Sequence, residues 1–598
     1  MFSDLKRVIR FTASYASAAL IFAGGASAQG LLVDPVAARN LSGAVLSPQA
    51  ETAAIPPAIN TGKAWIVAKA AWTETDEAGY AAFVQAIGRS DCRSLAACLK
   101  SSANPYRSDV DPTIHGDCAD MAYVLRAYYA WKNALPFSYQ NSMALASTRR
   151  EDIRYSTGGN VVAGRRQILN SVNDAPAFLR RIGGEVSTAM FRTHPETGGG
   201  RGHDDFYPVE ITRDAVRPGV IAYDIYGHVG IVYDILDDGR VMIVASHPDN
   251  TVSRSTYGPN FIRSAPKLGA GLKAWRPIAV KDAKVNEDGR LSGGVLYAPE
   301  NSDLPRFSME QFIGNEPAAS GVWHEGVFRH RGRTLKYYDF VRRRLAAPDF
   351  EYNPVEELRF GLRTICDSIR ARKVAVDNAA TARIYLKPHP EKLPPNIYGT
   401  YGEWEEYSTP SRDARLKVSF IELRRTLQSL VEDVSSGAPG VAYYGDDLAG
   451  DLLTAFEEEK DTCTFTYWRS DKTRMRLNLA HVMERLFDLS FNPYLCPERR
   501  WGAMGAELAT CTDNSEKEQW YNALRFLRYQ AERTYDVRMD FALNQLKPPM
   551  SARPEEGGLG VEAPADADIR TYIGRLNGIV SARYETAPEL VAIDYIEE

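Results

Sequence analysis

The fold of the first half of the chain is decided by the stretch VRPGVIAYDIYGHVGIVYDILDDGRVMIVASHPDN, residues 216–250. It contains two β-branched, apolar runs, Val229–Ile235 and Val241–Ala245, on either side of Leu236-Asp237-Asp238-Gly239. Such runs are typical of strands, and Asp-Gly between them is a strong signal for a tight turn. The stretch therefore predicts an antiparallel β-hairpin.

The predicted hairpin brings two histidines together. If it folds about Asp237 and Asp238, His228 lies opposite His247, at a cross-strand Cβ separation of about 5 Å. One imidazole can then act as general base to a nucleophile, while the other, or Asp249, holds it in the right tautomer. The alternative is an exposed hairpin that simply carries two histidines.

A candidate nucleophile stands earlier in the chain, in DPTIHGDCADMAYVLRAYYAWKNALPFSY, residues 111–139. The apolar spacing after Cys118 predicts an amphipathic helix, and Asp117 directly before it is a suitable N-cap. The free N–H groups and the positive end of the helix dipole favour thiolate over thiol and can stabilise an oxyanion. The alternative is a small, buried core cysteine.

Cys118 is also the odd member of a set of seven cysteines. The other six suggest three pairs: Cys92 with Cys98, Cys366 with Cys463, and Cys496 with Cys511. Six cysteines allow fifteen connectivities, so this pairing is one hypothesis among several. It leaves Cys118 as a free thiol that is inert, paired with another chain, or kept reduced for chemistry.

The N-terminus indicates export. Residues 1–28 have a basic start, an apolar stretch and then Ala26-Ser27-Ala28, as a secretory signal with a small-residue cleavage site does. The apolar stretch is shorter than the ~20 residues of a membrane span, and no later stretch is long and apolar enough for one. We expect a periplasmic or secreted protein of the bacterial envelope, where disulfides persist.

Length and composition bound the remaining possibilities. The 598 residues are 44% hydrophobic, which excludes global disorder. They carry a net charge of −5 with interspersed signs, which gives no nucleic-acid footprint. Apolar periodicity predicts helices at 356–374, 418–434, 475–489 and 518–546. The expected layout is a signal peptide (1–28), a linker or arm (29–62), a catalytic domain (63–280), a connecting region (281–335), a mainly helical domain (336–550), and a linker with a C-terminal tail (551–598).

Over about residues 105–255 the chain resembles the papain-like cysteine hydrolase superfamily, and it looks most like the NlpC-type cell-wall peptidases. The likeness rests on Arg217-Pro218-Gly219 before a strand, on Gly227-His228-Val229-Gly230-Ile231, and on a cysteine directly after an aspartate. It implies an α+β fold, with a papain-like helix plus antiparallel sheet catalytic domain followed by a mainly α-helical domain. It also implies Cys118 as nucleophile, His228 as base and His247 as the orienting residue.

Further positions are predicted as substrate contacts. In that family the residue matching Asp117 helps to hold a free amino group, and a tyrosine before the cysteine lines the pocket, as Tyr106 would here. The glycine-rich segment 194–208 suggests a mobile loop from which His203 or Asp204 reaches the substrate. The alternatives are an N-cap, core packing and a surface insertion. No metal site matches these spacings, and no cofactor is expected.

A second family also fits the cysteine segment. Gly116-Asp117-Cys118, a helix and then Leu135-Pro136-Phe137 are similar to the core of transglutaminase-like proteins. In that family Asp249 would be the natural third member of the site.

The leading hypothesis is an exported cysteine hydrolase that cleaves an amide bond in a cell-wall peptide through a thioester on Cys118. Its expected partners are peptidoglycan or a peptide substrate, and an envelope protein for the helical half. The alternatives are a transglutaminase-like acyl transferase and a catalytically inactive envelope interaction protein.

Overall fold

The computed structural model describes residues 60–148, 151–196, 203–398, 402–531, 540–546 and 564–578. The predicted signal peptide, nearly all of the predicted arm and most of the predicted C-terminal tail lie outside these residues. None of the described helices is long and apolar enough to cross a membrane. Helices and antiparallel sheets are both present, as the predicted α+β class requires.

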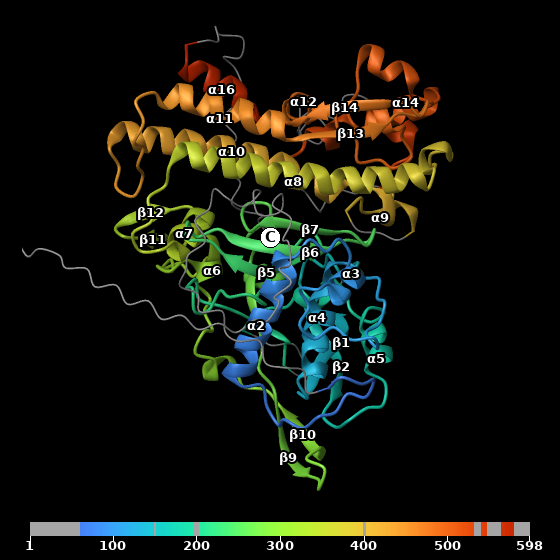
Figure 1. Cartoon of the computed structure of the whole chain (residues 1–598), viewed down its shortest axis with the longest axis vertical. Helices are drawn as coiled ribbons and strands as arrows, with labels where there is room; N and C mark the ends of the chain where they lie inside the picture. Colours follow the sequence, from blue (N-terminus) through green and yellow to red (C-terminus); the bar gives the residue numbers. More distant parts are fainter. Residues whose placement is uncertain are drawn as a thin grey trace, which may run out of the picture. The chain divides into compact units, whose positions relative to one another are not determined.

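A six-stranded antiparallel sheet organises the first half (Figure 1). In spatial order its strands are β3 (Phe206–Pro208), β8 (Gly271–Trp275), β4 (Ile221–Asp224), β5 (His228–Ile235), β6 (Val241–Ser246) and β7 (Val252–Thr256). Strands β5 and β6 form the predicted hairpin and match its expected ranges to within one residue at each end. The hairpin prediction is confirmed.

The first half also contains helices and two-stranded ribbons. The helices are α2 (Glu74–Arg89), α3 (Leu95–Lys100), α4 (Cys118–Lys132), α5 (Ala175–Ile182), α6 (Glu310–Ile313) and α7 (Tyr337–Leu345). The ribbons are β1 (Phe137–Leu145) with β2 (Asn160–Ile168), β9 (Ala279–Val285) with β10 (Leu291–Tyr297), and β11 (Phe328–His330) with β12 (Arg333–Leu335).

The sheet is buried on both faces, and alternate residues of its strands enter different cores. Val229, Ile231 and Val244 belong to the core that contains residues of α2 and α4. Val232 and Ile243 belong to the core that contains residues of α7. Because both faces are covered, the strands are continuous apolar runs, which is why they are recognisable in the sequence.

The hairpin reaches its predicted register by an unexpected route. Ile235 pairs with Val241, a register that by itself would bring His228 opposite Pro248. A β-bulge at Tyr233 then shifts the pairing by one residue. Beyond the bulge the strands have the predicted register, so the two histidines face each other.

The second half is mainly helical, and its longest helices contact one another. They are α8 (Pro354–Thr381), α10 (Pro410–Ser436) and α11 (Leu448–Thr462). The shorter elements are α9 (Glu403–Tyr407), β13 (Thr464–Trp468), β14 (Arg474–Asn478), α12 (Leu479–Glu484), α13 (Pro497–Arg500), α14 (Ser515–Ala523), α15 (Arg525–Tyr529) and α16 (Ile569–Leu576). Helix α8 also packs against β7 of the first half (Figure 1).

Two of the four helix predictions in this half are confirmed, because α8 and α10 contain residues 356–374 and 418–434. The other two are wrong in part. Residues 475–478 pair with β13 as the strand β14, so tertiary pairing overrides the helical pattern there. The expected helix at 518–546 is interrupted at Leu524, which separates α14 from α15.

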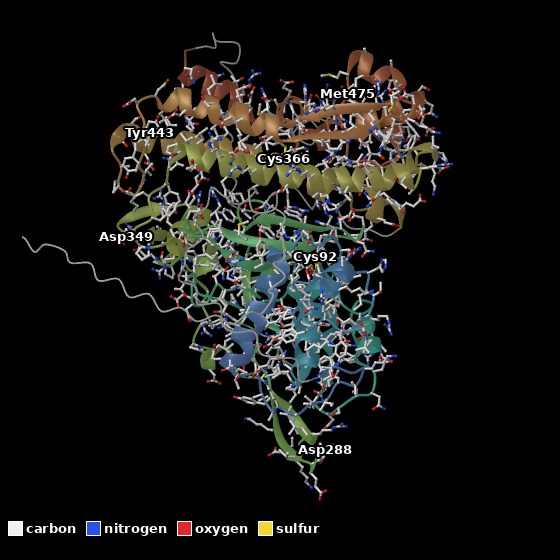
Figure 2. The ribbon with its side chains drawn as sticks, viewed as in Figure 1. Cys92, Asp288, Asp349, Cys366, Tyr443 and Met475 are labelled. Carbon is white, nitrogen blue, oxygen red and sulfur yellow. A yellow bond between two sulfur atoms is a disulfide. The ribbon has the colours of Figure 1, made fainter. Side chains whose placement is uncertain are left out.

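All three predicted disulfides are present, and Cys118 is the free member of the seven cysteines. Cys92 and Cys366, labelled in Figure 2, belong to the first and the second half. The Cys366–Cys463 bridge fixes the middle of α8 to the end of α11. Disulfides of this kind fit an oxidising compartment.

Candidate functional site

Cys118 begins helix α4, and the predicted N-cap is confirmed. The amides of Ala119 and Asp120 donate to the Asp117 carboxylate at 2.9 and 3.1 Å. In return, the Asp117 amide donates to the Asp120 carboxylate at 2.9 Å, which completes a capping box. The amides of Ala119 and Asp120 are therefore occupied and do not stabilise an oxyanion, contrary to expectation. The Cys118 amide does not donate to Asp117.

The surroundings of Cys118 oppose the expected thiolate. Burial, and then the neighbouring Asp117 carboxylate, raise the pKa of the thiol well above its usual range. The Val229 amide acts in the opposite direction by a smaller amount. Asp117 was expected as the N-cap, but its negative charge next to the thiol offsets the helix dipole that was expected to favour thiolate.

The two predicted histidines lie side by side. Their ring centroids are 5.5 Å apart and their planes differ by 8°. His247 Nε2 is 2.7 Å from the Ser253 hydroxyl on β7. Burial, followed by the charges of Arg412 and Arg415, lowers the pKa of His247 well below its usual value and so disfavours the charged imidazolium.

The thiol and the imidazoles approach their cavity from opposite sides of the sheet. Along β5, Val229 and Ile231 face the core of α4, so the alternate side chain of His228 points to the other face, where its ring lies 5.7 Å from Phe261. Within the described part of the chain, no hydrogen bond joins the Cys118 sulfur to either imidazole; its partner is the Gly227 carbonyl, at 3.9 Å.

One cavity of about 120 Å³ nevertheless receives all three predicted catalytic side chains, and both halves of the chain line it. The first half contributes Asp117, Cys118, Gly227, His228, His247 and Asp249. The second half contributes residues of α9 and α10 and of the segments before them, among them Tyr398, Glu405, Arg412 and Arg415. The site is therefore a composite of segments far apart in the sequence.

Asp249 lines this cavity but does not orient a histidine. Its carboxylate accepts two hydrogen bonds from Arg412, at 2.8 and 2.9 Å, and one from the Thr251 hydroxyl at 2.6 Å. Arg412 and Thr251 hold the pKa of the Asp249 carboxyl below its usual value despite its burial. The predicted orienting role is therefore wrong, because the Asp249 carboxylate is bound by Arg412 of the second half.

Tyr106 is not at the cavity, so its predicted substrate contact is wrong. It is buried in an aromatic cluster, with ring centroids 5.7 Å from Phe83 and 5.6 Å from Tyr129. The physical reason is ordinary packing: the helix face of α4 that carries Tyr129 needs an aromatic partner there.

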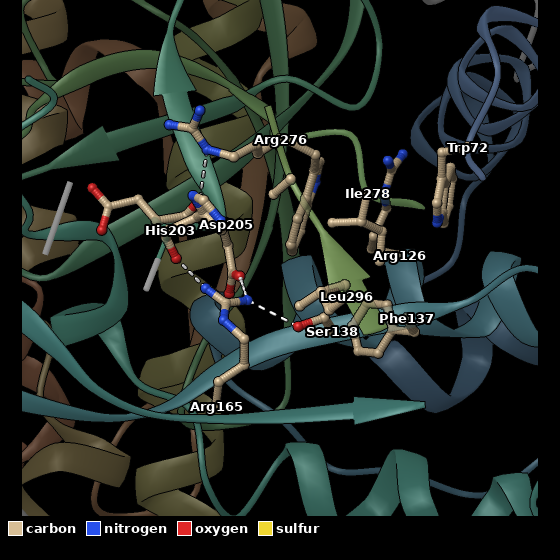
Figure 3. Close-up of a pocket in the computed structure, with 13 residues that line it drawn as sticks. Trp72, Arg126, Phe137, Ser138, Arg165, His203, Asp205, Arg276, Ile278 and Leu296 are labelled. Carbon is tan, nitrogen blue, oxygen red and sulfur yellow. Dashed lines mark hydrogen bonds and ion pairs between the residues drawn. The ribbon is translucent and has the colours of Figure 1, made fainter. Parts of the chain in front are cut away.

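His203 and Asp204 lie at a different, smaller cavity of about 20 Å³ (Figure 3). Arg165 donates to the His203 carbonyl and pairs with Asp205 at 2.5 Å, which holds this end of the segment against β2. A space of this size holds about one water molecule. The predicted reach of His203 or Asp204 to the substrate is therefore corrected, while residues 197–202 lie outside the described residues.

Sequence reasoning missed the contributions of Ser253 and of Arg412. Ser253 could have been found by extending the hairpin to a third strand, because it pairs with Ala245 two residues before His247. Arg412 gave no local signal, since its partner Asp249 is 163 positions earlier in the chain.

Comparison of the chain with protein-family models, with curated proteins and with solved structures finds no match. Its function is therefore inferred from the site alone.

Proposed function

We propose that the chain is an exported cysteine hydrolase with a papain-like catalytic domain, which cleaves an amide bond in a cell-wall peptide. The observation that carries this proposal is the single cavity lined by Cys118, His228 and His247. A free cysteine at a helix start, in a chain whose other cysteines are all bridged, also supports it. The three disulfides support export.

The proposed reaction uses the Cys118 thiol as the nucleophile and the His228 imidazole as the base. As the sulfur attacks the amide carbonyl, the S–H proton passes to His228, and the Cys118 amide stabilises the oxyanion. Collapse expels the amine, which takes the proton from His228, and leaves a thioester on Cys118. Water then attacks the thioester, releases the acid and restores the thiol.

This reaction requires the His228 ring to reach the sulfur once substrate is bound. Catalytic hydrogen bonds are often long in a ligand-free site and tighten in the substrate complex. The sulfur contacts the carbonyl of Gly227, the residue directly before His228, so the backbone at His228 is near the thiol while the His228 ring lies on the other face of the sheet.

A second candidate is a catalytically inactive envelope interaction protein. The raised pKa of the Cys118 thiol favours it, as does the lack of a thiol–imidazole hydrogen bond among the described residues. Transglutaminase-like acyl transfer is less favoured, because Asp249, its expected third member, is engaged by Arg412.

Digestion of purified peptidoglycan by the wild type, Cys118→Ala and His228→Gln, followed by mass spectrometry, separates these functions. A hydrolase gives new amine and carboxyl ends with the wild type and none with either variant. A labelled amine incorporated into the product would instead show acyl transfer. Equal, unchanged digests from all three proteins would establish the inactive alternative.

A further inference from the structure

We propose that Arg412 of helix α10 is a positioning residue for the Cys118 site, so that the helical half completes the site. This inference rests on the proposed function, because it assigns a role in the same reaction. Arg412 is a residue of the second half whose side chain reaches across the cavity to the turn that follows His247.

The contact of Arg412 with this turn is buried and two-pronged. Its two terminal nitrogens donate to the two oxygens of Asp249, and one of them also donates to the Thr251 hydroxyl at 2.8 Å. The side chains of Arg412 and Asp249 are only 11% and 2% exposed. A planar guanidinium that binds a carboxylate at two points fixes its orientation as well as its position.

The turn held by Arg412 carries one catalytic segment and contacts the other. The His247 amide donates to the Thr251 carbonyl at 2.9 Å, so the turn fixes the backbone of His247. At its tip, the Asn250 side chain accepts from the Gly116 amide at 3.1 Å. The Ser246 hydroxyl donates to the Gly116 carbonyl at 2.6 Å. The position of this turn therefore fixes both the backbone of His247 and the loop that precedes Cys118.

Arg412 can act as a fixed support because the start of α10 is itself anchored in the second half. The Thr409 amide donates to the Phe491 carbonyl at 3.1 Å. Asp413 forms a buried, two-point ion pair with Arg372, at 2.8 and 3.1 Å. The backbone of Arg412, between Thr409 and Asp413, is therefore fixed by contacts within the second half.

The test compares Arg412→Met and the double variant Arg412→Met with Asp249→Asn against the wild type, in the peptidoglycan assay. The double variant removes both buried charges, so it remains informative if the single variant does not fold. We expect kcat to fall about 100-fold in both, the size of effect that a misplaced catalytic group produces, while KM changes little. Arg424→Met is the matched control: it lies on the same helix and pairs with Asp566 at 2.5 Å, outside the cavity.

Chemical rescue adds a measurement that a purely structural role would not move. Guanidinium ion, at a concentration well below that which unfolds the protein, should restore turnover to Arg412→Ala and should fail to do so when Asp249 is also Asn. An unchanged kcat in the double variant, a loss confined to KM, or a rise in kcat would each overturn the positioning role.

These outcomes are distinct from a failure of the proposed function. If Cys118→Ala digests peptidoglycan as the wild type does, or the wild type does not digest it, the proposed function fails. If the wild type is active and Cys118→Ala is not, yet both Arg412 variants keep the wild-type kcat, this inference alone fails.

Discussion

At the scale of single residues, burial and then a neighbouring charge raise the pKa of the Cys118 thiol. Asp117 caps the helix, and its carboxylate and burial together raise the pKa of the thiol. The wild-type thiol should therefore react with iodoacetamide more slowly at neutral pH than free cysteine does, and the rate should rise as the pH rises, because thiolate is the nucleophile.

Asp117→Asn should raise the alkylation rate of Cys118 at a given pH. Asparagine keeps the N-cap hydrogen bonds but removes the negative charge, so the thiol pKa falls and more thiolate is present. We expect an increase of roughly three- to tenfold, which corresponds to half to one pKa unit. Asp120→Asn is the control and should have a smaller effect, since Asp120 raises the thiol pKa less than Asp117 does. An unchanged rate in Asp117→Asn would contradict this electrostatic account.

Gly227 is the second residue on which the site depends. It has φ +77°, and a Cβ there would lie 2.7 Å from the Tyr155 hydroxyl. Gly227→Ala should therefore destabilise the protein. It should also reduce turnover, because Gly227 contacts the Cys118 sulfur and directly precedes His228. Gly289→Ala is the matched control: Gly289 has φ +78° and open space around it, so it should cost only the backbone strain of about 1–2 kcal/mol. Thermal unfolding and the peptidoglycan assay measure both; equal losses would count against a steric role for Gly227.

At the scale of elements, a bulge and a turn set the site. The bulge at Tyr233 restores the register that faces His228 with His247, and the turn after His247 receives the Asp249 pair. The bulge and the turn are both irregular backbone, and bulges commonly occur where a strand changes the direction of particular side chains.

The Cys366–Cys463 bridge should be the most stabilising of the disulfides, because it closes the longest segment. Its cysteines are 97 positions apart, against 15 for Cys496–Cys511. The chain-entropy model gives about 4–5 kcal/mol for the long loop and about 3 kcal/mol for the short one. Denaturant unfolding of the two double alanine variants measures the difference. A larger loss in Cys496→Ala with Cys511→Ala would reverse the expected order.

At the scale of the whole molecule, a buried charge cluster joins the two halves. Glu357 of α8 pairs with Arg240, beside the hairpin turn, at 2.5 Å and with Arg342 of α7 at 2.6 Å. Asp238 pairs with the same two arginines, at 2.6 and 3.1 Å. The turn end of the β5–β6 hairpin is thus fixed to the helical half, as its other end is by Arg412.

Glu357→Ala should destabilise the chain by about 3–5 kcal/mol, because it leaves two buried guanidiniums with one carboxylate. Arg240 and Arg342 lower the pKa of the Glu357 carboxyl to about 2 despite its burial. The unfolded carboxyl therefore takes up a proton first as the pH falls below its ordinary value of 4.5, and stability is lost between there and about pH 2. The loss is on the order of 3 kcal/mol.

Urea unfolding of the wild type and of Glu357→Gln across this pH range tests the sign. The glutamine variant should be less stable at neutral pH and should lose less stability on acidification. A parallel pH dependence in the two proteins would show that Glu357 is not the group responsible.

The sequence by itself determined the features that depend on near neighbours. These are the hairpin runs and the capped helix at Cys118. The three cysteine pairs were one hypothesis among fifteen connectivities, and the tertiary structure selected them. Apolar runs, helical periodicity and capping are local, so they can be identified without knowing the fold.

Only the tertiary structure decided the chemistry of the site. In the folded chain, the His228 side chain lies on the sheet face opposite α4, and Asp249 pairs with Arg412 of the second half. Cys118 is buried next to the Asp117 carboxylate. The physical reason is that pKa values and ion pairs depend on burial and on partners distant in the chain, which no local pattern encodes.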